Sequence, residues 1–152
     1  MGNQTKVRSP RFNHVAMSVP AELLGEVGRK ELVAFYQDVF GWEEQPYMTK
    51  DGKILVLQCH QYDQFVFLIA DDNPMSCPHL DHFGLSVGTA EELDAMLERA
   101  KAYQAHDDRV RIIDRKVERY EAGLALTSFY VGYLLPMMVE IQHYDWHAGA
   151  AK

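Results

Sequence analysis

Two histidines of this chain occupy matching positions in an internal repeat. The segment 12–19 (FNHVAMSV) returns at 80–87 (LDHFGLSV), with the histidine, the serine and the final valine in the same places. A repeat at this distance predicts two copies of one supersecondary unit, each opening with a strand that carries a histidine. Corresponding points of a pseudo-symmetric fold can meet at its centre, and histidine is the commonest metal ligand in proteins. The pair His14 and His82 therefore indicates a metal site.

The elements that must position His14 form a first unit. The segment 12–19 alternates with the period of a strand. An apolar stripe with helical spacing follows a loop-like stretch at 20–28, and Gly41 stands where a helix-ending glycine is expected. The stripe consists of Leu32, Phe35, Tyr36, Val39 and Phe40. Three further strands are predicted, a short one at 42–48 and two more at 53–59 and 64–70.

The second unit repeats this order after a linker at 71–79 that is rich in proline and polar residues. Its opening strand is predicted at 81–87. Thr89 and Glu92 form a capping-box pattern at the start of a helix. The buried stripe of that helix is Leu93, Met96, Leu97 and Ala100. The last three strands are predicted at 112–120, 124–133 and 137–144, so the order β-α-β-β-β occurs twice.

Four motifs together resemble the vicinal oxygen chelate superfamily, which includes glyoxalase I, methylmalonyl-CoA epimerase, antibiotic-resistance proteins and extradiol ring-cleaving dioxygenases. They are 13–16 (NHVA), 35–42 (FYQDVFGW), 81–84 (DHFG) and 139–141 (VEI).

The resemblance implies an α+β fold in which two βαβββ units form paired, curved, antiparallel-rich sheets around a central metal cavity. It implies a single domain at 11–146, with unit one at about 11–71, unit two at about 80–146, and tails at 1–10 and 147–152. It also implies a homodimer, because members commonly pair or swap units between chains.

In the superfamily, metal ligands lie on the first and last strands of each unit. By that resemblance the ligands here are His14, His82 and Glu140, because the strand 65–69 of unit one offers none. Glu140 stands between Val139 and Ile141, and a carboxylate directed inward from such an apolar strand needs a compensating partner. Two histidines and one carboxylate resemble the extradiol dioxygenase set, which holds Fe(II) and leaves adjacent positions open. Iron is the first expectation, with Mn, Zn, Ni and Co as alternatives.

Tyr130 resembles the extradiol tyrosine that lies ten residues before the carboxylate ligand and hydrogen-bonds a metal-bound substrate oxygen. A core aromatic on a strand is the alternative role. The acid–base histidines of that family are missing, because their positions hold Phe67 and Glu121. The apolar segment 133–136 is expected to line a pocket for an aromatic substrate or to pack in a dimer interface.

Three functions remain open at this point. The first is a ring-cleavage dioxygenase acting on a catecholic substrate and O2. The second is a metal-dependent lyase, isomerase or epimerase, in which the metal acts as a Lewis acid and Glu121 is the candidate base. The third is a binding protein that holds a small aromatic ligand without catalysis.

Composition excludes other classes. The net charge of −7, without a stripe of Lys and Arg, argues against nucleic-acid binding. No apolar run is long enough to span a membrane, and residues 1–11 lack the apolar stretch of a signal peptide. The two cysteines form neither a CxxC pair nor a disulfide-rich pattern. A cytoplasmic protein is therefore expected.

Overall fold

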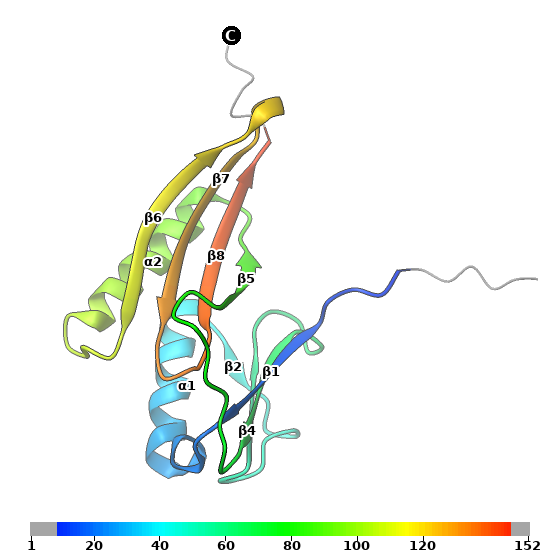
Figure 1. Cartoon of the computed structure of the whole chain (residues 1–152), viewed down its shortest axis with the longest axis vertical. Helices are drawn as coiled ribbons and strands as arrows, with labels where there is room; N and C mark the ends of the chain where they lie inside the picture. The colour runs from blue at the N-terminus through cyan, green and yellow to red at the C-terminus, as the bar shows by residue number, and fades with distance from the viewer. Residues whose placement is uncertain (1–8, 147–152) are drawn as a thin grey trace, which may run out of the picture.

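A computed structural model describes residues 9–146; the predicted tails lie outside this range, apart from residues 9 and 10. The order β-α-β-β-β occurs twice, as predicted (Figure 1). Unit one contains β1 (His14–Val19), the 3-10 helix η1 (Ala21–Leu24), α1 (Glu26–Phe40), β2 (Glu43–Glu44), β3 (Ile54–Gln58) and β4 (Phe65–Ala70). Unit two contains β5 (His82–Ser86), α2 (Ala90–Gln104), β6 (Arg111–Arg119), the 3-10 helix η2 (Glu121–Gly123), β7 (Ala125–Gly132) and β8 (Met138–Asp145).

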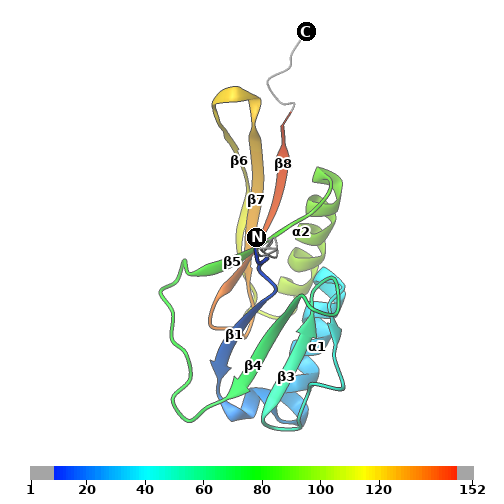
Figure 2. The same ribbon diagram turned by 90° about the vertical axis from the view of Figure 1, so that its right-hand side faces the viewer.

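Each unit builds one four-stranded sheet with the same topology. The first sheet has the order β1-β4-β3-β2 and the second has the order β5-β8-β7-β6. The opening strand pairs in parallel with the last strand of its unit, and the other pairs are antiparallel. The histidine-bearing strands β1 and β5 are therefore edge strands, and Figure 2 shows them in different sheets, with β5 above β1 in that view.

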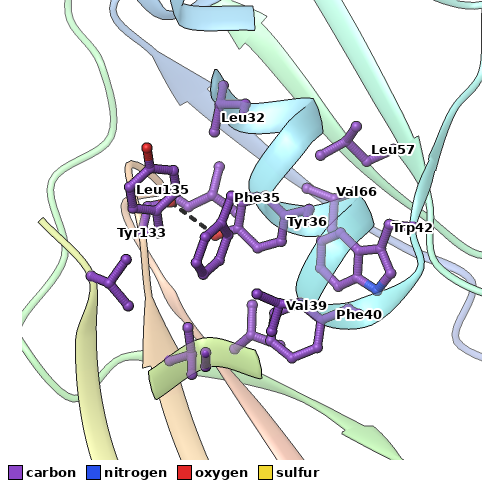
Figure 3. Packing of buried hydrophobic residues seen from close by; sticks show 14 of the residues in the cluster. Leu32, Phe35, Tyr36, Val39, Phe40, Trp42, Leu57, Val66, Tyr133 and Leu135 are labelled. Atoms are coloured by element: carbon purple, nitrogen blue, oxygen red, sulfur yellow. Dashed lines mark hydrogen bonds between the residues drawn. The ribbon is translucent and has the colours of Figure 1, made fainter. Parts of the chain in front are cut away.

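One hydrophobic core joins the two units. Residues of α1, α2 and both sheets belong to a single buried cluster. At the junction, Tyr36 donates a hydrogen bond of 2.9 Å to the carbonyl oxygen of Tyr133, which links α1 to the turn between β7 and β8 (Figure 3). Because the helices cover one face of each sheet, the opposite faces are left for polar and functional residues.

Local signals in the sequence explain the ends of both helices. Gly41 ends α1 in the left-handed conformation with φ of 72°, which glycine adopts without steric cost. The predicted capping box begins α2, since Thr89 and Glu92 each accept a hydrogen bond from the other's backbone N–H.

Three details differ from the sequence expectations. Helix α1 begins at Glu26, within the stretch predicted as a loop, because η1 supports its first turn. The strand expected at 42–48 is only two residues long, since Pro46 and a turn follow. Tyr133 and Leu135 are buried in the core, so the segment 133–136 contributes these side chains to folding rather than to a pocket or an interface.

Candidate metal centre

The open face of the second sheet gathers several polar residues of unit two. Strand register aligns Gly84 of β5, Glu140 of β8 and Tyr130 of β7 in one row across the sheet. His82 and Gln142 lie on the same face, since side chains alternate with period 2 along a strand. The neighbouring β8 residues Val139 and Ile141 face the core. The alternation that buries β8 against the helices thus directs Glu140 toward the open face.

His82 and Glu140 form a close pair. The Nε2 atom of His82 lies 3.4 Å from Oε2 of Glu140, and Glu140 is 5% exposed. On the other side of the ring, Nδ1 lies 2.8 Å from the carbonyl oxygen of Leu80. A carbonyl only accepts hydrogen bonds, so Nδ1 carries the proton, and in the neutral ring Nε2 presents a lone pair to the carboxylate.

A positive charge between these two acceptors satisfies both of them, either as a second proton on the His82 ring or as a bound metal ion. Gln142 donates a hydrogen bond of 2.8 Å to Oε2 of Glu140 but leaves the His82 lone pair without a donor. Two neighbouring ligands of one metal ion, each about 2.1 Å from it, lie roughly 3.0–3.4 Å apart. The spacing and the donor types of His82 and Glu140 therefore fit a divalent metal, which a carbonyl-anchored histidine commonly binds.

His14 has the same local arrangement at the edge of the first sheet. Its Nδ1 lies 2.9 Å from Oδ1 of Asn13, and its ring stacks on Phe65 with a centroid distance of 5.0 Å. Among residues 9–146, the Nε2 atom of His14 has no hydrogen-bond partner. Within residues 9–146 of one chain, however, no three His, Cys, Asp or Glu side chains are close enough to hold a metal together. The structure thus brings together His82 and Glu140 and leaves His14 apart from them.

Tyr130 lies beside this pair. Its ring packs edge-on against the His82 ring at 5.0 Å, and the Lys116 ammonium lies 5.7 Å from its centroid. Partial burial, followed by the interaction with the Glu140 carboxylate, raises the pKa of Tyr130 to about 12. At neutral pH the phenol therefore keeps its proton and can donate a hydrogen bond to an oxygen atom bound near His82.

The candidate base Glu121 and the remaining histidines do not join this pair among the described residues. Glu121 is in η2 at the far end of the sheet, beyond the Ala125–Asp145 pair. Asp145 is five residues from Glu140, so Glu121 is more than about 16 Å away within one chain. His143 pairs in register with Thr127, on the opposite face from Glu140. His60 lines a cavity between the units, and His147 lies outside the described residues.

Sequence reasoning overlooked Gln142, which contacts Glu140 directly. Its signal was the period of two, because residues 140 and 142 share one face of β8. Phe67 lies opposite Ala16 in the first sheet and provides no acid–base group.

Comparisons with models of protein families and with curated proteins find no match. Solved structures do match. Lactoylglutathione lyase from Agrobacterium tumefaciens is 19% identical, with a TM-score of 0.54 over 89% of this chain and 94% of that protein. The fosfomycin resistance protein FosX from Listeria monocytogenes is 14% identical, with a TM-score of 0.59 over 93% and 96%. An integron cassette protein from Vibrio cholerae is 16% identical, with a TM-score of 0.56 over 93% and 100%.

These similarities confirm the fold class predicted from the sequence. The chain has the same paired βαβββ fold as these proteins.

No helix within residues 9–146 is both long and apolar enough to cross a bilayer.

Proposed function

We propose that this protein is a divalent-metal enzyme whose substrate binds the metal through two adjacent oxygen atoms. The metal ligands are His82 and Glu140 of one chain and His14 of a second copy. One observation carries this proposal. Two hydrogen-bond acceptors, Nε2 of His82 and Oε2 of Glu140, face each other at a distance of 3.4 Å. Their anchoring by Leu80 and Gln142 keeps both acceptor atoms in place before any metal binds.

A homodimer supplies the third ligand in this proposal. His14 and His82 lie on β1 and β5, which are both free edges of their sheets. An edge strand has unpaired backbone groups that another chain can cover. Bringing the β1 edge of one copy beside the β5 edge of another would unite His14 with His82 and Glu140, and a twofold axis would generate two such sites.

The bound metal would act as a Lewis acid and orient the substrate oxygens. The chain's own residues then have defined roles. Tyr130 donates a hydrogen bond to one of these oxygens, since its pKa of about 12 keeps it protonated. Gln142 holds the Glu140 carboxylate in position. Gly84 and Ser86 have small side chains on this face and leave space above the metal.

For the reaction itself we infer a ring-cleavage dioxygenase that acts on a catecholic substrate with Fe(II) and O2. The set of two histidines and one carboxylate supports this inference, because it leaves adjacent coordination positions open for both reactants. The nearby phenol of Tyr130 supports it as well. A small aromatic molecule and O2 are then the partners of the site.

A lyase or isomerase is the second candidate. It is favoured by the substitution of both acid–base histidines by Phe67 and Glu121, and by the similarity of the fold to a lactoylglutathione lyase. Its base is not Glu121 of the same chain, which lies at the far end of the sheet.

Elemental analysis of protein purified without oxygen tests this proposal. We expect about one metal ion per chain, lost in His82→Ala and retained in the matched control His106→Ala, whose histidine is exposed beyond α2. Iron together with O2 consumption on adding catechol supports the dioxygenase. Zinc, nickel, manganese or cobalt, with solvent-proton exchange into a 2-oxo substrate, supports the lyase or isomerase. Failure to bind any metal after reconstitution would leave a non-catalytic binding protein.

A further inference from the structure

We propose that Arg111 binds a carboxylate group of the substrate, so that the preferred substrate is a small acid that also chelates the metal. This inference rests on the proposed function for the position of the chelating oxygens. The anion site itself is defined by Arg111, Gly132 and His79.

The guanidinium of Arg111 lies flat across a glycine. Arg111 and Gly132 are register partners at the ends of β6 and β7. A Cβ atom built on Gly132 would lie 2.9 Å from Nη2 and 3.3 Å from both Nε and Cζ of Arg111. The absence of a side chain at position 132 is therefore what lets the guanidinium cross the open face of β7.

One contact fixes this orientation. Nη1 of Arg111 donates a hydrogen bond of 2.9 Å to Nδ1 of His79, in the segment that leads into β5. Within residues 9–146 no carboxylate lies at ion-pair distance from Arg111. The Nε–Nη2 edge therefore keeps both of its donors available, and this edge is the one that binds a carboxylate with two parallel hydrogen bonds.

The neighbouring cation on this face is already paired. Lys116 lies 3.5 Å from the Glu118 carboxylate and stands over the Tyr130 ring. Of these two cations, Arg111 is the one whose charge has no carboxylate partner among the described residues.

The position of Arg111 fits one end of a small ligand. The strand register places Gly132 and His82 in the same row. Val131, which precedes Gly132, pairs with Val139 of β8, and the adjacent β8 residue, Met138, pairs with His82 of β5. The backbone of Gly132 is thus two strand spacings, or about 10 Å, from that of His82. A single aromatic acid can span from the metal site to the guanidinium across Met138, with Tyr130 beside it in the neighbouring row.

The first test uses full-length, metal-free protein and sodium benzoate at constant ionic strength. The ¹⁵N–¹H resonance of Arg111 Nε should shift with saturation. The resonance of Arg115, which is on the same strand but pairs with Asp94, should not move. In Gly132→Ala the charge remains but the guanidinium is displaced, and benzoate affinity should fall at least about tenfold. No saturable shift at Arg111, or the same shift at Arg115, would overturn the inference.

The second test uses Fe(II)-loaded protein without oxygen and compares catechol with 3,4-dihydroxybenzoate by calorimetry. The wild type should bind the acid at least about tenfold more tightly. Arg111→Gln and Arg111→Lys should lose this preference, and Arg115→Gln should keep it. Equal affinity for both diols in the wild type would overturn the inference and leave the metal site intact. Absence of binding by either diol, with benzoate still bound at Arg111, would instead overturn the proposed function and the substrate assignment together.

Discussion

At the scale of single residues, the chemistry depends on which nitrogen of each histidine is free. His14 and His82 both direct Nδ1 to a neighbouring oxygen acceptor, Oδ1 of Asn13 and the carbonyl of Leu80. This shared arrangement fixes the tautomer and leaves Nε2 available to a metal. The repeat that made the two histidines conspicuous in the sequence is therefore accompanied by a repeat of their local hydrogen bonding.

Glu140→Gln tests the carboxylate at nearly constant shape. The amide lacks the charge that a divalent ion requires, so metal affinity measured by calorimetry should fall by at least about 100-fold. The control is Glu118→Gln, which removes a charge from β6 on the same face and should bind metal like the wild type. Wild-type affinity in the Glu140 variant would show that this carboxylate is not a ligand.

At the scale of elements, strand alternation and helix packing place the site. The buried alternate residues of β8 hold the strand against the helices, and the same alternation turns Glu140 and Gln142 to the other face.

On the unit-one side, η1 packs against the first turn of α1. A Cβ on Gly28 would lie 2.6 Å from the carbonyl oxygen of Glu22 and 2.7 Å from Cα of Leu23.

Gly28→Ala should therefore destabilise the protein, although glycine-to-alanine changes inside helices usually stabilise them by up to about 1 kcal/mol. Backbone atoms of η1 must move to admit the methyl group, and such overpacking costs about 1–3 kcal/mol. Urea unfolding measures the change. Ala102→Gly, at an exposed position of α2, should show the ordinary propensity cost of about 1 kcal/mol. A gain in stability for Gly28→Ala would contradict the close packing of α1 on η1.

Sequence reasoning succeeded where the signal was local. The two helices were predicted from the apolar stripe between Leu32 and Phe40, the helix-ending Gly41 and the capping box at Thr89. The order of the strands was predicted from the internal repeat. It missed the helical start at Glu26 because the support comes from η1 packing rather than from apolar periodicity. The roles of Gly132 and Arg111 were also hidden, because their contact depends on the register of β6 and β7.

At the scale of the whole molecule, both units share a core but leave two histidine-bearing edges open. The core includes phenols held in apolar surroundings. Burial raises the pKa of Tyr36 and Tyr133 well above the ordinary tyrosine value, and that of Tyr130 to about 12. The native state therefore retains phenol protons that the unfolded chain releases above about pH 10.

Stability should consequently fall in alkaline solution. Each raised pKa adds to the free energy of unfolding. This contribution is fully present below the unfolded-state pKa near 10 and is lost as the pH rises toward the native-state pKa. Each retained proton gives a slope of about −1.4 kcal/mol per pH unit. Between pH 10 and 12, Tyr36→Phe should make the fall of the unfolding free energy less steep by about 1.4 kcal/mol per pH unit, and exposed Tyr62→Phe should leave the slope unchanged. An unchanged slope in the Tyr36 variant would contradict the assigned burial effect.

The central claim is that two copies of the chain share each metal centre. It is tested most directly by counting metal ions in a mixed dimer of His14→Ala and Glu140→Ala chains, isolated by two different tags. Each variant alone should bind no metal. The mixed dimer has one complete site, with His82 and Glu140 from the first chain and His14 from the second, and should bind about one ion. A mixed dimer without metal, or a His14→Ala parent that retains it with wild-type affinity, would contradict the shared centre.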